Sequence, residues 1–131
     1  MKTKNLISIV IFLLISIILF AQTKSKDNSI SITKEKLLAL KNIEVLLDSF
    51  PKDNYVISNY KITIIRKNNM EPLEFNACGR TLPGNVKKAI PTLLTGDKIY
   101  FEYINAKSLD SVSCDNNMVL FPAISLKISA K

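Results

Sequence analysis

The 131-residue chain has no histidine, only two cysteines, and few of the residues that mark turns: three glycines and five prolines. The lack of histidine excludes a Cys–His protease, because the cysteine nucleophile of that class needs an adjacent base. It also argues against a zinc site, since neither Cys78 nor Cys114 has a second ligand at short spacing. The low glycine and proline content argues against a turn-dense, seven-stranded immunoglobulin domain.

Other patterns that could carry chemistry are incomplete. Asp110 and residues 115–117 form an acidic and amide cluster, but their spacing matches no calcium-binding loop and favours a solvated turn. The serines are scattered without the Gly-x-Ser-x-Gly sequence of a nucleophile elbow. We therefore predict a protein that is not an enzyme, with no catalytic residue, no metal ligand and no cofactor.

The N-terminus has the pattern of an export signal. Lys2 and Lys4 precede an apolar run at residues 6–20, which is shorter than the roughly 20 residues of a membrane-spanning helix. Ala21 is a small residue at the end of this run, so we predict a signal peptide over residues 1–21 that is cleaved after Ala21. The bulky Leu19 leaves an uncleaved membrane anchor as the alternative. Cleavage would give an exported protein, periplasmic or extracellular, with no membrane span.

The basic residues do not form a nucleic-acid surface. The formal net charge is +7, and two of the 18 basic residues lie in the predicted leader. The remainder are dispersed along the chain and are not interleaved with aromatic residues. A solvated surface explains this pattern better than a nucleic-acid partner, which we do not expect.

Behind the leader, residues 22–32 are polar at their start and are predicted to be a flexible lead-in, followed by one domain over residues 33–131. Thr33 precedes a short helix at 34–40. The alternation that begins at residue 43 predicts a strand ending at Phe50-Pro51.

The rest of the domain alternates in strands around one more helix. Strands are predicted at 55–67 and 73–77, and a helix begins near Pro83 and ends near Ala89 or Ile90. Two closing strands follow a Gly-Asp turn. Their predicted core faces consist of Ile99, Phe101 and Tyr103 on one strand, and of Leu120, Ile124, Leu126 and Ile128 on the other.

Pro122 interrupts the last strand, which points to an edge position or a bulge. About five strands and one or two short helices, in mostly antiparallel order, predict a mainly β fold. The expected form is a small antiparallel β-sandwich or a curled sheet with helices over one end, and α+β is the alternative class.

Two pairs of residues are candidates for a site. Cys78 and Cys114 could form a disulfide in an oxidising compartment, and the alternative is two isolated thiols. Tyr100 and Phe121 fall on the opposite phase from the predicted core residues, which favours contact with a protein partner. Burial under a helix or a second sheet is the alternative.

The run TLPGNVKKAIPTLLTGDKIYFEYINAK, followed by VLFPAISLKIS, resembles the C-terminal domain of GldM, the periplasmic shaft protein of Bacteroidetes gliding motility and type IX secretion. The resemblance extends from about Thr33 to the end of the chain and is clearest over Gly-Asp-Lys-Ile-Tyr-Phe-Glu. The family usually has an Asp-Gly turn in its last hairpin, where this chain has Asp110-Ser111 in a longer loop.

The resemblance implies a non-enzymatic domain that binds cell-envelope or secretion-system components. GldM-like shaft proteins carry a membrane helix and further periplasmic domains ahead of this one, whereas here we expect a free-standing domain behind a signal peptide. The shaft is dimeric, so a homodimer formed by edge pairing is a further expectation. A secreted binding or inhibitory module that reuses the fold is the alternative function.

Overall fold

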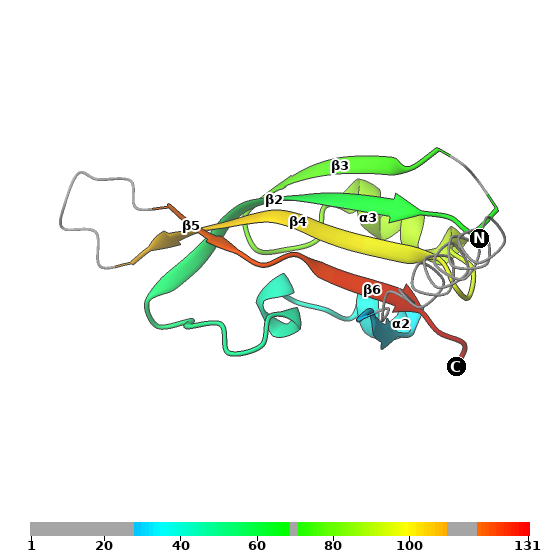
Figure 1. Cartoon of the computed structure of the whole chain (residues 1–131), viewed down its shortest axis with the longest axis horizontal. Helices are drawn as coiled ribbons and strands as arrows, with labels where there is room; N and C mark the ends of the chain where they lie inside the picture. Colours follow the sequence, from blue (N-terminus) through cyan, green and yellow to red (C-terminus); the bar gives the residue numbers. More distant parts are fainter. Residues whose placement is uncertain (1–27, 69–70, 110–117) are drawn as a thin grey trace, which may run out of the picture.

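The computed structural model describes residues 28–68, 71–109 and 118–131. In this part of the chain six strands form one sheet in the order β1-β6-β4-β2-β3, and β5 also pairs with β4 (Figure 1). The fold is mainly β, as predicted, and all of these strands belong to a single sheet. The strands are β1 (Ile30–Ile32), β2 (Tyr55–Ile65), β3 (Leu73–Cys78), β4 (Lys98–Ser108), β5 (Met118–Phe121) and β6 (Ile124–Ile128).

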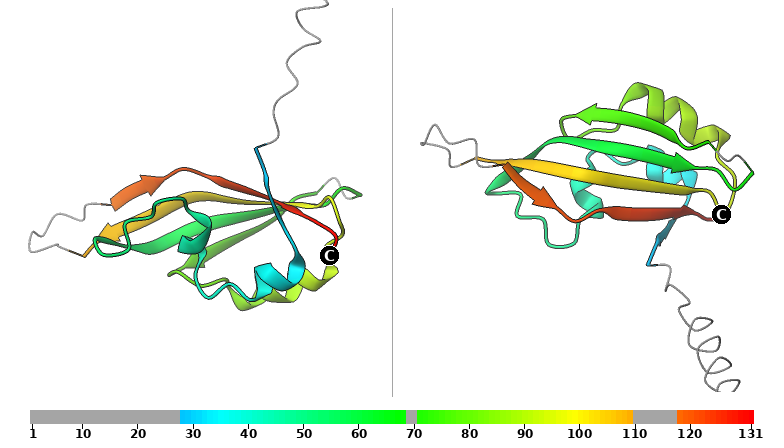
Figure 2. Two further views of the ribbon diagram at one scale, coloured as in Figure 1. Left: turned by 90° about the horizontal axis from the view of Figure 1, so that it is seen from below. Right: turned by 45° about the horizontal axis from the view of Figure 1, so that its top comes forward.

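The helices are short and cover one side of the sheet. Helix α2 spans Lys34–Leu38, α3 spans Gly84–Ala89, and the 3₁₀ turns η1 and η2 span Ile43–Leu46 and Ile90–Thr92. Figure 2 shows α2 and α3 on the same side of the sheet, while no described element covers the other side. The core therefore lies between the sheet and these helices. Its largest fully buried side chains include Leu37, Ile62, Ile90, Phe101 and Leu126.

The segment 43–47 does not form the strand that its alternation predicts. Ile43 and Glu44 are both buried, and they belong to the 3₁₀ turn η1. Arg80 is the cause: its backbone oxygen accepts a hydrogen bond from the Ile43 N–H at 2.9 Å, and its guanidinium contacts the Glu44 carboxylate at 2.5 Å. Because a buried carboxylate needs such a partner, the segment is held against the loop that carries Arg80 and not in the sheet.

The two long central strands, β2 and β4, change register at a bulge. Asn59 pairs with Asn105 whereas Lys61 pairs with Glu102, so β4 carries one residue more than β2 across this interval. Tyr103 lies within it with a backbone φ of 50°, in the left-handed region. The bulge turns the Tyr103 side chain outward, 65% exposed, so the prediction that Tyr103 belongs to the core face was wrong.

The strands β5 and β6 both pair with the same edge of β4. β6 pairs with residues 98–101 of β4, and β5 pairs with residues 104–107. Pro122, which has no backbone N–H, lies between them, where the sequence predicted an edge or a bulge. The interruption changes the alternation: Leu126 is fully buried, whereas Leu120 is 64% exposed and does not belong to the predicted core face.

The predicted Gly-Asp turn ties three parts of the chain together. Gly96 has a φ of 96°, which glycine adopts without strain, and its N–H donates to the Ile128 backbone oxygen at 2.8 Å. The buried Asp97 carboxylate accepts hydrogen bonds from the N–H groups of Lys67, at 2.9 Å, and Leu94, at 2.8 Å. The start of β4 is thereby joined to the end of β2 and to the end of β6.

Residues 30–32, which the sequence placed in the lead-in, form the strand β1. This strand pairs in parallel with β6, so that Ile30 lies beside Leu126 and Ile32 beside Ile128. Ile32 is buried, and its backbone oxygen accepts a hydrogen bond from the Ser129 N–H at 2.9 Å. The sheet therefore begins ahead of Thr33.

Candidate interaction surfaces

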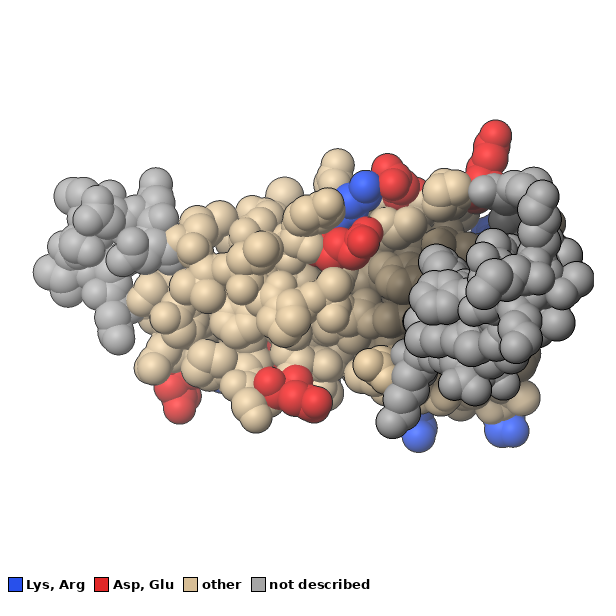
Figure 3. All heavy atoms as spheres, in the orientation of Figure 1, with Lys and Arg blue, Asp and Glu red and all other residues tan. Residues whose placement is uncertain are grey.

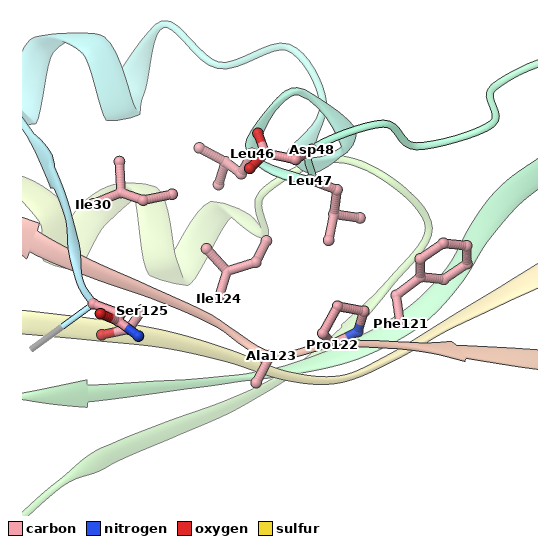
Figure 4. Close-up of a pocket in the computed structure, with 10 residues that line it drawn as sticks. Ile30, Leu46, Leu47, Asp48, Phe121, Pro122, Ala123, Ile124 and Ser125 are labelled. Atoms are coloured by element: carbon pink, nitrogen blue, oxygen red, sulfur yellow. The ribbon is translucent and has the colours of Figure 1, made fainter. Parts of the chain in front are cut away.

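A groove lies where β5 gives way to β6, and we call it the β5–β6 groove. Its volume is about 220 Å³, and it is open to solvent. Figure 4 shows residues that line it: Leu46 of η1 and Leu47 directly after it, Ile30 of β1, and Ile124 of β6. Segments that are far apart in the sequence therefore meet at this point. The remaining lining residues are Asn28, Asp48, Phe121, Pro122, Ala123 and Ser125.

The floor of the groove is apolar and its rim is polar. Leu47 and Ile124 are buried beneath it, and Ile30 leaves 47% of its surface exposed. Asp48 is exposed and is the acidic residue among those that line the groove. The arrangement suits a ligand that places an apolar side chain inside and a polar or basic group at the rim.

Phe121, one of the two residues predicted to contact a partner, lies at one end of this groove. Its ring centroid is 4.9 Å from that of Phe50 and 6.2 Å from that of Tyr55. These rings half-bury Phe121 from one side, and the residue also lines the groove. The structure thus places Phe121 at the β5–β6 groove, and its contact with a partner stays a prediction.

Tyr100, the other residue predicted to contact a partner, lies elsewhere. Its neighbours Ile99 and Phe101 are buried against the helices, so Tyr100 lies on the opposite, uncovered face of the sheet. It pairs across the sheet with Thr63 of β2 and Ser125 of β6, and it is half-buried. The structure does not bring Tyr100 and Phe121 into one site.

The uncovered face of the sheet carries a ladder of polar contacts. Lys61 donates to Glu74 at 2.9 Å, and this hydrogen bond raises the pKa of the Lys61 ammonium. Thr63 donates to Glu102 at 2.9 Å, on the same face. Figure 3, which views this face, shows few charged side chains among the described residues and a broad uncharged middle. These contacts satisfy the polar groups of a sheet face that meets solvent.

The second predicted pair is only partly described. Cys78 is exposed at the end of β3 and has no disulfide partner among the described residues, and Cys114 lies outside them. The disulfide between them stays a prediction. The acidic and amide cluster at 110 and 115–117 also lies outside the described residues, and the described ones contain no group of three potential metal ligands.

Sequence reasoning missed Ile30, Leu46 and Asp48, which build much of the groove. The Ile30-Ser31-Ile32 alternation was the one available signal, and it follows a polar stretch that resembles a linker. Leu46 and Asp48 belong to the segment predicted as a strand, where their place beside β6 has no local signature.

Residues 16–129 match the family described as the GldM C-terminal domain. The chain belongs to that family. The resemblance based on the Gly-Asp-Lys-Ile-Tyr-Phe-Glu run is confirmed, and the chain is a domain related to gliding motility and type IX secretion. No curated protein matches the sequence significantly. Among the described residues, no helix is long and apolar enough to cross a membrane.

In the run on which the resemblance to the GldM C-terminal domain was based, the residues have structural roles. Gly96 and Asp97 form the turn that ties β4 to its neighbours, and Ile99 and Phe101 fill the core behind it. The match therefore accounts for the fold, whereas the groove and the β5 edge have to be assigned from their own geometry.

Proposed function

We propose that this GldM C-terminal domain is an exported, non-enzymatic module that binds a protein component of the cell envelope or of the secretion machinery. The family match over residues 16–129 carries the proposal, because the family is tied to an envelope-associated assembly. The predicted leader over residues 1–21 supports export of the domain to that compartment.

The β5–β6 groove is the surface that we assign to this binding. Among the residues that line it, Ile30 is 47% exposed, Leu46 and Phe121 are half-buried, and Pro122 and Ala123 are exposed. Exposed apolar groups beside a hollow of about 220 Å³ are typical of a protein-interaction surface. Phe121, in contact with Phe50, gives this surface a half-buried aromatic border.

The experiment is an affinity capture from envelope extracts of a gliding or type IX secreting bacterium. The immobilised bait is the chain without residues 1–21, and the recovered motility and secretion components are quantified by mass spectrometry. Two variants are compared with the wild type: Ile30→Lys, which places a charge in the groove, and Ile65→Lys at the far end of β2. Ile65 is 44% exposed, close to the value for Ile30, so the two substitutions are matched.

We expect the wild type and Ile65→Lys to recover a motility or secretion component, and Ile30→Lys to lose most of it. Recovery of no such component would overturn the proposal. Recovery of other proteins alone would favour the alternative function, a secreted binding or inhibitory module that reuses the fold.

A further inference from the structure

We infer that the β5–β6 groove receives an extended segment of the partner, which adds to the sheet as a strand along the outer edge of β5. This inference rests on the proposed function, since it specifies how the domain would bind a protein. It commits to one kind of ligand: an unfolded or exposed strand with apolar side chains at alternate positions and a basic residue near one of them.

The sheet leaves a position open beside β5. The strand β4 has both β6 and β5 along one edge, but the parallel strand β1 lies only beside β6. β1 begins at Ile30, opposite Leu126, and among the described residues no strand pairs with the outer edge of β5. An added strand would occupy the position beside β5 that β1 occupies beside β6, on the other side of Pro122.

A strand edge selects a strand as its ligand. The N–H and C=O groups along the edge of a strand are regularly spaced, and an extended chain can pair with them in succession. Natural edges are usually protected by lysine, proline or inward-pointing charge. The four residues of β5, Met118–Phe121, include no charge and no proline, whereas the opposite edge strand β3 carries Glu74 in its salt bridge with Lys61.

The groove provides for the side chains of such a strand. In a strand, alternate side chains point to opposite faces, so every second residue of an added strand would point toward the helix-covered side. On that side the groove offers an apolar floor of Leu47 and Ile124, with Ile30 at its end in line with β1 (Figure 4). Backbone pairing and a pocket for alternate side chains together are the two elements of recognition by strand addition.

Charge adds the preference for a basic residue. Asp48 is exposed at the rim of the groove. A lysine or arginine one or two positions from the inserted apolar side chain could reach this carboxylate. We expect this contact to affect selectivity and association rate more than affinity, because a pair at the rim stays solvated.

The test starts from short linear peptides selected from a random display library against the chain without residues 1–21. Binding of the selected peptides is measured by fluorescence anisotropy. Each peptide is then made in two further forms, with alternate backbone amides N-methylated in one register or in the other. Only the amides on one edge of an added strand pair with β5, so we expect one form to bind about tenfold more weakly or worse and the other to bind almost unchanged.

Protein variants locate the peptide. Ile30→Lys should weaken binding about tenfold, and Ile65→Lys should leave it unchanged; circular dichroism checks that both are folded. Asp48→Lys should weaken peptides that carry a basic residue and leave the others unchanged. In amide NMR spectra, the resonances of residues 118–121 should shift most.

Several outcomes would overturn the inference: failure to select any peptide, equal effects of the two N-methylated forms, or binding that Ile30→Lys does not change. Sedimentation that shows a second copy paired through β5 would also overturn it, because the edge would then be filled by the chain itself. If the domain captures an envelope component and the selected peptides do not displace it, the proposed function is supported and binding by strand addition is contradicted. If peptides bind at the edge of β5 but no envelope component is captured, the proposed function is contradicted instead.

Discussion

Asp97 is a single buried carboxylate on which two loops depend. It is 2% exposed, and it accepts hydrogen bonds from the N–H groups of Lys67 and Leu94. Substitution by alanine would remove both part-buried hydrogen bonds, and a hydrogen bond to a charged group contributes about 1.5–3 kcal/mol. We therefore expect Asp97→Ala to lower the free energy of unfolding by about 3 kcal/mol in urea denaturation. Asp53→Asn, at an exposed aspartate, is the control, and equal stability of the two variants would contradict the assignment.

Tyr60 should make the stability of the domain depend on pH in the alkaline range. The side chain is 3% exposed, its hydroxyl donates to the Thr81 backbone oxygen at 2.8 Å, and burial raises its pKa to about 12 from the ordinary value of 10.0. Above pH 10 the unfolded chain therefore loses this proton before the folded one does. The contribution of Tyr60 to stability is complete below pH 10 and is lost as the pH rises through about 12, by about 2–3 kcal/mol in all.

Urea denaturation of the wild type and of Tyr60→Phe at a series of pH values between about 9 and 12 checks this prediction, because this range includes both pKa values of Tyr60. The hydrogen bond to Glu74 also raises the pKa of Lys61, so the stability that this contact contributes is lost as the pH rises above the ordinary value of 10.5; Lys61 is present in both proteins, and its effect cancels in the difference. Parallel curves for the two proteins would show that Tyr60 ionises as freely in the folded state as in the unfolded one.

At the scale of whole elements, the break at Pro122 predicts unequal effects for two leucines that alternation assigned to one face. Leu126 in β6 is fully buried, and Leu120 in β5 is 64% exposed. Leu126→Ala should cost about 2–5 kcal/mol, because it removes buried methyl groups and leaves a cavity. Leu120→Ala should change stability by less than about 0.5 kcal/mol. Chemical denaturation of the two variants is the measurement, and similar losses would contradict the change of phase between β5 and β6.

The strands themselves could be predicted from the sequence because their signal is local. Alternation located β2 and β3 and the start of β4, and the Gly-Asp turn was recognised from its residue types. Alternation failed at Tyr103, where a bulge set by pairing with β2 reverses the phase, and at residues 43–47, where Arg80 holds the segment as a 3₁₀ turn. Both failures come from contacts with segments that are distant in the sequence, and the local alternation of apolar residues carries no information about such contacts.

The candidate groove was less predictable for the same reason. Phe121 was identified because its phase differed from that of the predicted core residues, but its partners Phe50 and Tyr55 come from a loop and a strand far earlier in the chain. The wall residues Ile30 and Leu46 come from two more segments. A site assembled from four parts of the chain has no spacing motif, so only the folded arrangement reveals it.

For the molecule as a whole, the sheet has one face under the helices and one face in solvent, and its two edges differ. The β3 edge carries the Lys61–Glu74 salt bridge nearby, whereas the β5 edge is apolar and adjoins the groove. Under the function that we propose, this asymmetry favours contacts with other proteins at the β5 edge over the β3 edge. The same asymmetry makes pairing between two copies through β5 the competing arrangement, which sedimentation distinguishes from strand addition.

The strand β1 sets where this whole unit must begin. Ile32 is buried, the three residues 30–32 pair with β6, and Ser129 donates to the Ile32 backbone oxygen at 2.9 Å. Removal of residues 1–21, the predicted leader, leaves all of these contacts in place and should not change the unfolding free energy. Removal of residues 1–32 deletes them and should cost about 2–4 kcal/mol, from the buried isoleucine and the lost hydrogen bonds. Urea denaturation of the two truncated proteins makes the comparison, and equal stability would mean that β1 contributes nothing to the domain and that the parallel pairing with β6 is dispensable.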